Sequence, residues 1–273
     1  MSQVTTGDRT ELWLPLLQRL SQLCPYWVVW KNAESAFTGV GDIDAAAPDA
    51  DWPTIELEFR HWAQEHKVGP VAVCHHIPGG MNLVAVPPGM ATLLEVGVKA
   101  TRIWRGTTLF VLDDLKPLMD WDPRGFRRLR PGAEGLFKLL LNGVRWDGKP
   151  NAEGLRSKQV IPLLQQDPGG VYEAARVLGP TQHLAIRAAE RVVAGGWDRN
   201  AMLAVQFWAL LKCARHPTLT VNRVRFLMLN RMGLPFTQTR RCPVVAALDD
   251  KRRIPVNREQ WLMRVAATHP VYA

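Results

Sequence analysis

The longest uncharged stretch of the chain, residues 68–94, places the tightest limit on the fold. It is long enough to cross a membrane as a helix, but prolines and glycines recur along it. Each proline would break such a helix, because it lacks a backbone N–H and its ring clashes with the preceding turn. Two apolar runs, 71–77 and 81–86, flank a Pro-Gly-Gly turn, which predicts a β-hairpin. We therefore expect strands in a protein with no membrane partner.

The rest of the N-terminal half alternates between helical and strand patterns. Residues 10–23 repeat apolar positions at helical spacing, and residues 26–30 form a short aromatic and β-branched run typical of a buried strand. Further expected elements are helices over 32–37 and 52–66 and strands over 42–47, 93–100 and 102–112. This order predicts an α/β (α+β) domain in which helices flank a mixed sheet.

From about residue 131 the pattern becomes helical, with proline or glycine in each gap. The expected helices span 133–141, 154–166, 171–178, 182–194, 199–215 and 221–232. We predict an α/β domain over residues 1–125 and a basic, all-helical domain over residues 126–273.

Charge is distributed unevenly between the two parts. Residues 1–98 hold 5 basic and 11 acidic residues, a net charge of −6, whereas residues 99–273 hold 29 basic and 14 acidic residues, a net of +15. The basic part either meets a polyanion such as RNA or carries a solvated basic surface that keeps it in solution. Its basic clusters are Arg127, Arg128 and Arg130, then Arg240, Arg241, Lys251, Arg252 and Arg253.

The four cysteines are far apart and form no CxxC pair. This spacing excludes a disulfide scaffold, argues against a structural zinc site and suits a reducing compartment. The polar, charged N-terminus does not have the pattern of a signal peptide. We expect a cytoplasmic protein.

Asp42 and Asp44 form the most informative pair of residues. Side chains at positions i and i+2 of a strand project from the same face, so the two carboxylates lie side by side while Ile43 points into the opposite, buried side. Adjacent carboxylates repel one another unless a cation joins them, and Mg²⁺ prefers oxygen ligands. Gly39 and Gly41 would permit a tight turn and leave space for phosphates. The alternative is that the two aspartates only decorate the entrance of a strand.

These residues resemble the nucleotidyltransferase superfamily, which has the polymerase-β-like fold. Its pattern is a strand, a short helix, a strand with two spaced aspartates, and a later strand with a third acid. The subgroup that the chain most resembles is a set of bacterial nucleotidyltransferases with an L-K-G…D-I-D pattern. This chain has Trp30-Lys31-Asn32 where that group has Leu-Lys-Gly. Residues 94–98, followed by Trp104-Arg105-Gly106, resemble the strand of the third acid and its turn, and the resemblance covers residues 26–115.

The resemblance implies a role for each residue. Asp42 and Asp44 would bind Mg²⁺, with Mn²⁺ as an alternative, and Glu95 would act as metal ligand and general base. The nucleoside triphosphate, for example ATP, would contact Lys31, Asn32, Ser35, Gly39, Gly41, Arg105 and Lys138. The chain departs from the family in lacking Gly-Gly or Gly-Ser at the first helix. It also has Gly97 at the aligned third acid, with Glu95 two residues earlier.

Two functions remain open at this stage. The first is transfer of a nucleoside monophosphate from an NTP to a hydroxyl of an RNA end, a protein side chain or a small molecule. The second is a catalytically impaired member of the fold that binds a nucleotide or a partner. Lys138 either contacts the nucleotide or extends from a helix edge into solvent. The adjacent histidines His75 and His76 point to opposite faces of a strand, which favours a structural role.

Overall fold

The computed structural model describes residues 8–211 except 40, 70, 75–79, 86–92, 105–106 and 152–156, and then positions 217–218, 221, 224–225 and 228. The described chain is mixed α/β and contains a mixed sheet. It divides into two compact units. Unit 1 includes the described residues up to Ala100 and Trp121–Arg127, and unit 2 comprises those of Thr101–Asp120 and Arg128–Val224. The expected domain division at residue 125 stays a prediction.

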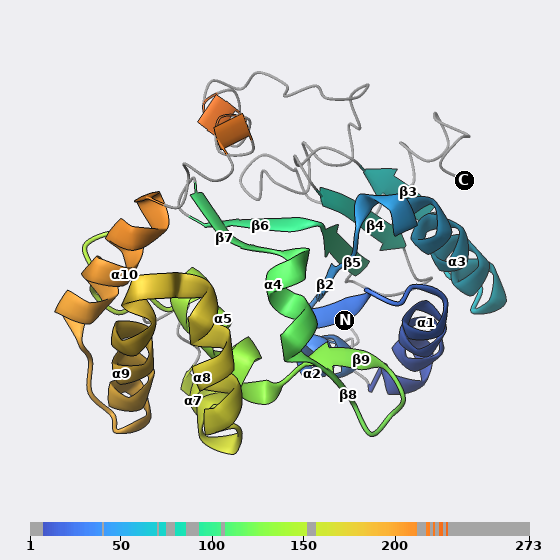
Figure 1. Ribbon diagram of the computed structural model, residues 1–273. Coiled ribbons are helices and arrows are strands. Elements are labelled where there is room, and N and C mark those ends of the chain that lie inside the picture. Colours follow the sequence, from blue (N-terminus) through green and yellow to red (C-terminus); the bar gives the residue numbers. More distant parts are fainter. Residues whose placement is uncertain are drawn as a thin grey trace, which may run out of the picture. The chain divides into compact units, whose positions relative to one another are not determined.

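Unit 1 contains the strand–helix–strand segment that the sequence predicts (Figure 1). A short helix connects its first two strands, and a longer helix follows the second strand. In chain order the elements are α1 (Thr10–Leu23), β1 (Val28–Lys31), α2 (Ala33–Phe37), β2 (Ile43–Ala46), the 3₁₀ turn η1 (Asp49–Asp51), α3 (Trp52–Glu65), β3 (Val71–Cys74), β4 (Gly80–Ala85) and β5 (Leu94–Lys99).

The sheet has the strand order β3-β4-β5-β2-β1-β9-β8, where β8 is Met119–Trp121 and β9 is Arg127–Leu129. The expected hairpin is confirmed, since β3 and β4 are antiparallel. Strand β2 is antiparallel to β1 and parallel to β5. Strand β9 is not among the strands that the sequence predicts. Its three residues are too few to produce a recognisable alternation in the sequence.

The core of unit 1 lies between one face of the sheet and the helices α1 and α3, which lie side by side (Figure 1). Trp13 of α1 stacks on Trp62 of α3 with 5.1 Å between ring centroids. The strand residues in this core alternate along each strand and include Val29, Ile43, Ala45, Met81, Leu83, Val96 and Val98. Residues between them point to the other face of the sheet, and a register shift in β1 between Val29 and Lys31 brings Lys31 to that face, opposite Asp44.

Unit 2 is mostly helical. The segment expected as one strand over 102–112 is instead two antiparallel strands, β6 (Thr101–Trp104) and β7 (Thr107–Val111). The elements that follow are α4 (Leu112–Leu115), the 3₁₀ turn η2 (Lys116–Leu118), α5 (Pro131–Asn142), α7 (Ser157–Gln166), α8 (Pro168–Ala175), the 3₁₀ segment η3 (Arg176–Thr181), α9 (Gln182–Val193) and α10 (Arg199–Leu211). Within the described ranges, no helix combines the length and the apolar character that crossing a bilayer requires.

Helix α5 packs closely against α7 and α8. The approach is tightest at Gly132, where a Cβ atom would lie 1.9 Å from the carbonyl oxygen of Asp167. Asp167 also caps α8 by accepting a hydrogen bond from the Gly170 backbone N–H, at 2.8 Å. Arg130 completes the junction by pairing with the Asp167 carboxylate, with Nη2 2.7 Å from Oδ1. Glycine is required at position 132 because no larger side chain fits between these two helices.

Candidate functional site

The face of the sheet opposite the core carries a row of polar residues. Asp44 of β2 is paired in register with Lys31 of β1 and with Gly97 of β5, and Gly97 is paired in turn with Asn82 of β4. Cross-strand partners project from the same face, so the four positions form one line across four adjacent strands. We call Asn82, Gly97, Asp44 and Lys31 the polar row.

Asp44 is the acid of the polar row, and it is buried. Its carboxylate oxygen Oδ2 lies 2.9 Å from Lys31 Nζ and accepts a hydrogen bond of 2.9 Å from Asn32 Nδ2. Only 10% of the Asp44 side chain and 12% of the Lys31 side chain are exposed. Low exposure strengthens the attraction between these charges, because water screens them poorly there. Three of the residues predicted to form the site are therefore in contact.

The backbone conformation of Asn32 positions its side chain. It lies between the end of β1 and the start of α2 with a φ of 71°, in the left-handed region. Asparagine adopts this region more readily than most residues. The resulting bend reverses the chain and returns the Asn32 amide to Asp44.

Asp42 lies one residue before β2 and is partly buried. Burial raises the pKa of its carboxyl group above the usual value of 3.8, and the negative charge of Asp44 raises it further. The positive charges of Lys31 and Lys99 act in the opposite direction on this pKa. A cation beside Asp42 would favour the ionised form of this carboxyl group.

The turn between α2 and β2 is held by Ser35, whose backbone carbonyl accepts hydrogen bonds from the Gly41 N–H and the Thr38 hydroxyl, both at 3.1 Å. Gly39 has a φ of 73°, and a Cβ atom on Gly41 would lie 2.9 Å from the Cβ of Ser35. Ser35, Gly39 and Gly41 are therefore brought together beside Asp42, and the backbone geometry of the turn explains both glycines.

Glu95 lies on the same face of β5 as Gly97, two residues earlier. Its Oε1 accepts a hydrogen bond of 3.4 Å from Asn82 Nδ2. The position next to Asp44, where the resemblance would place a third acid, is held by Gly97.

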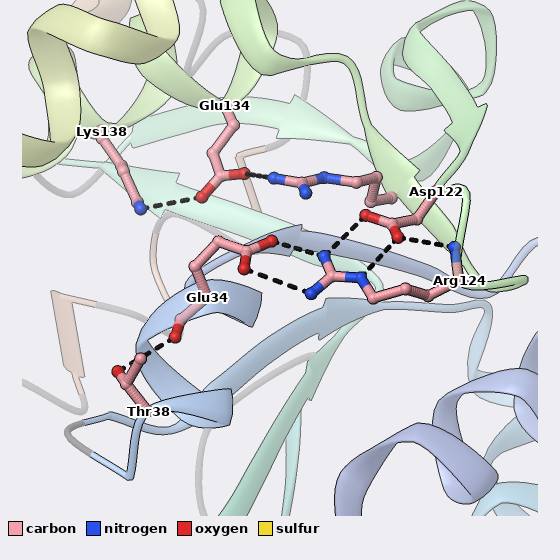
Figure 2. Close-up of polar contacts among 7 residues, drawn as sticks. Glu34, Thr38, Asp122, Arg124, Glu134 and Lys138 are labelled. Carbon is pink, nitrogen blue, oxygen red and sulfur yellow. Dashed lines mark hydrogen bonds and ion pairs between the residues drawn. The ribbon is translucent and has the colours of Figure 1, made fainter. Parts of the chain in front are cut away.

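The structure does not bring the other predicted residues to the site within its described part. Several of them lie outside the described residues, namely Arg105, the pair His75 and His76, and the basic cluster 240–253. Lys138 belongs to α5 of unit 2, where its Nζ lies 2.8 Å from Glu134 Oε1 (Figure 2).

The arginines of the first basic cluster all contact protein groups. Arg127 donates to the Cys24 carbonyl at 3.0 Å. Arg128 pairs with Glu134 at 2.9 Å, and Arg130 pairs with Asp167 as described above. Each of these three arginines thus has a partner within the protein.

The sequence did not predict Asn82, Lys99 or Arg124 as functional residues. Asn82 and Lys99 are buried polar residues on the same face of the sheet as Asp44. Each lies next to an apolar residue of the core in its strand, and this alternation is the signal that would have identified them. No local pattern in the sequence marks Arg124. Its guanidinium group bonds to Asp122, with Nε 2.6 Å from Oδ1, and to Glu34 of α2, with Nη2 2.5 Å from Oε1 (Figure 2).

Arg124 anchors the helix that lies between Lys31 and Asp42 in the chain. Besides binding Glu34, its guanidinium group lies 4.5 Å from the ring centroid of Phe37 at the other end of α2. Hydrogen bonding to Asp122, followed by that to Glu34, raises the pKa of Arg124. The guanidinium group is therefore a permanent positive charge that fixes α2 to the segment 122–126.

The site offers oxygen ligands suited to a hard cation. Two carboxylates, Asp42 and Asp44, approach one another closely enough for the charge of one to raise the pKa of the other. Asp44 Oδ1 accepts no hydrogen bond from the described residues and lies 3.8 Å from the place of a Cβ on Gly97. Within the described ranges, no cluster of three or more His, Cys, Asp or Glu side chains forms a ready-made metal centre.

No family model matches the chain, and no curated protein and no solved structure is significantly similar to it.

Proposed function

We propose that this protein is a Mg²⁺-dependent nucleotidyltransferase, which moves a nucleoside monophosphate from an NTP to a hydroxyl acceptor. The observation that carries the proposal is the convergence of Lys31, Asn32 and Asp44, with Asp42 one residue before β2, on the sheet face opposite the core. The resemblance predicts a strand, a short helix, an acid-bearing strand and a later strand, and this order supports the proposal. The later strand, β5, pairs with β2 in parallel.

Asp42 and Asp44 would hold the Mg²⁺ ion, or Mn²⁺ in its place. Mg²⁺ is normally bound by one or two carboxylates together with phosphate oxygens of the substrate. When bound, the metal supplies charge neutralisation at the phosphate that reacts. The raised pKa of Asp42 supports this assignment, because it marks a place where added positive charge is favourable.

Lys31 and Asn32 would bind the triphosphate. Lys31 and Asn32 both donate to the same oxygen of Asp44. A cation held by Asp44 would weaken the attraction of that oxygen for Lys31, and the Lys31 ammonium group would then be able to bind a phosphate. Most of the rate enhancement in phosphoryl-type transfer comes from such positioning and charge neutralisation.

Glu95 would remove the proton of the attacking hydroxyl. It lies on the site face of β5, adjacent to the strand of the acid pair. A general base must come within hydrogen-bonding distance of the hydroxyl it activates, and the length of the glutamate side chain helps it reach past Gly97.

A second candidate is a protein of the same architecture that binds a nucleotide or a partner without transferring anything. Two observations favour it: Gly97 at the aligned position of the third acid, and the Lys31–Asp44 ion pair, which neutralises one of the two aspartates.

Nucleotide transfer separates the two candidates. Protein is incubated with each α-³²P-labelled NTP and Mg²⁺ in the presence of RNA, protein or small hydroxyl compounds, and labelled product and pyrophosphate are measured. Transfer that is abolished by Asp42→Asn and by Asp44→Asn supports the transferase, with the exposed Asp49→Asn as the matched control. Nucleotide binding without pyrophosphate release for any acceptor class contradicts transfer and supports the binding protein.

A further inference from the structure

The space above Gly97, in the middle of the polar row, could hold a ligand. A Cβ atom on Gly97 would lie 3.5 Å from Asn82 Oδ1 and 3.8 Å from Asp44 Oδ1. Both distances are ordinary van der Waals contacts, so an alanine side chain would fit there. We call this space the Gly97 gap.

Asn82 directs its carbonyl oxygen into the Gly97 gap. The residue is 9% exposed, and its Nδ2 donates to Glu95 Oε1 at 3.4 Å. This contact fixes the orientation of the amide, because the opposite orientation would bring two oxygen atoms together. Asn82 Oδ1 accepts no hydrogen bond from the described residues. This oxygen is therefore available to a cation or a hydrogen-bond donor that enters the Gly97 gap.

Asp44 faces the same gap from the other side. Its Oδ2 is occupied by Lys31 and Asn32, which leaves Oδ1 as the oxygen nearest to Gly97. The gap is therefore lined by one carboxylate oxygen and one amide oxygen from the two strands that flank β5. Carboxylate and amide carbonyl oxygens are both ligands of hard divalent cations.

We infer that Asn82 is a metal ligand, which supplies across the Gly97 gap the oxygen that a third acid on β5 would otherwise provide. This inference rests on the proposed function, since it completes the cation site of Asp42 and Asp44. It also assigns different roles to two neighbouring strands: Asn82 of β4 would bind the cation, and Glu95 of β5, which accepts a hydrogen bond from the Asn82 amide, would act as the base.

The inference is tested by Mn²⁺ binding to the full chain in the presence of the non-reacting analogue α,β-methylene-ATP, followed by electron paramagnetic resonance. Asn82→Leu removes the ligand while keeping the volume, and Asn82→Asp keeps a ligand oxygen. Gly97→Ala fills the gap with a methyl group. We expect the dissociation constant for Mn²⁺ to rise about tenfold or more in Asn82→Leu and Gly97→Ala, and to stay unchanged or fall in Asn82→Asp.

The outcomes separate the two proposals. If the wild-type protein binds no Mn²⁺ with the nucleotide, both fail. If Asp42→Asn and Asp44→Asn lose Mn²⁺ while Asn82→Leu and Gly97→Ala bind it normally, the acid pair stands and the role of Asn82 is refuted. Loss in Asn82→Asp as well as Asn82→Leu, or normal binding in Gly97→Ala, also refutes that role. Should Asn82→Leu not fold, Asn82→Asp and Gly97→Ala decide the question.

Discussion

Lys31 and Asp44 form an ion pair between neighbouring antiparallel strands, with 2.9 Å between Nζ and Oδ2 and little exposure of either side chain. Removing one partner of such a pair leaves a poorly solvated charge behind, which is more destabilising than the pair itself is stabilising. A bound divalent cation would provide the same compensation for Asp44 that Lys31 provides. The free energy of unfolding, measured with and without Mg²⁺, therefore tests whether a cation binds at Asp44.

Lys31→Ala is expected to lower the free energy of unfolding by about 3 kcal/mol, because Asp44 loses its counter-charge. Millimolar Mg²⁺ should restore part of this loss, since it binds the folded state. Urea denaturation with and without Mg²⁺ measures both effects. The control is Lys116→Ala at the exposed pair with Asp113, which should cost less than about 1 kcal/mol and respond little to Mg²⁺. Equal Mg²⁺ responses in the two variants would contradict the assignment.

Asp42→Asn is expected to stabilise the protein at neutral pH. The pKa of Asp42 is raised in the folded state, mainly by burial and then by Asp44, so the folded state binds the proton more tightly than the unfolded chain. The contribution of Asp42 to stability is therefore fully present below about pH 3.8, the unfolded value, and is lost as the pH rises through the folded pKa.

The measurement is a comparison of Asp42→Asn with the wild type by denaturant unfolding from pH 4 to 7. The advantage of the variant should shrink as the pH falls. A variant that is less stable than the wild type at pH 7 would show that Lys31 and Lys99 outweigh the burial of Asp42.

Arg124→Ala should reduce the free energy of unfolding by about 3 kcal/mol. The guanidinium group is bidentate to Asp122, whose side chain is only 3% exposed, so its loss removes the positive charge beside a buried carboxylate. Arg124→Lys should recover only part of the loss, because an ammonium group cannot form the same paired hydrogen bonds. Glu34→Gln, at the exposed end of the contact, is the control and should change stability by less than about 1 kcal/mol.

Gly132→Ala is expected to destabilise unit 2 by at least about 1–3 kcal/mol, because the added methyl group meets the Asp167 carbonyl oxygen between α5 and α8. Gly69→Ala is the matched control, since a Cβ at that position meets nothing within 4 Å. Thermal unfolding of the two variants compares them directly. A Gly132→Ala protein as stable as the Gly69→Ala protein would refute the close approach of the helices.

Part of the site could be read from the sequence because it is local. Lys31, Asn32, Asp42 and Asp44 belong to two successive strands and one short helix, and alternation along a strand assigns Asp44 to the face opposite Ile43. The helices α1 and α3 were predicted almost to the residue by their apolar spacing.

Other parts depend on contacts between distant segments. The Arg124–Glu34 pair joins residues 90 positions apart, and no local pattern specifies it. Asn82 joins the polar row only because β5 lies between β4 and β2 in the sheet, an order that alternation within one strand cannot reveal. Strands β8 and β9 have three residues each, and their positions in the sheet come from the rest of the fold.

The most direct test of the central claim is isothermal titration of the full chain with each NTP, with and without Mg²⁺, for the wild type and for the double variant Asp42→Asn/Asp44→Asn. We predict that NTP binds only with Mg²⁺ and that the double variant, shown to be folded by circular dichroism, does not bind it. Absence of NTP binding by the folded wild type, or equal binding by the double variant, would contradict a nucleotide site at the acid pair.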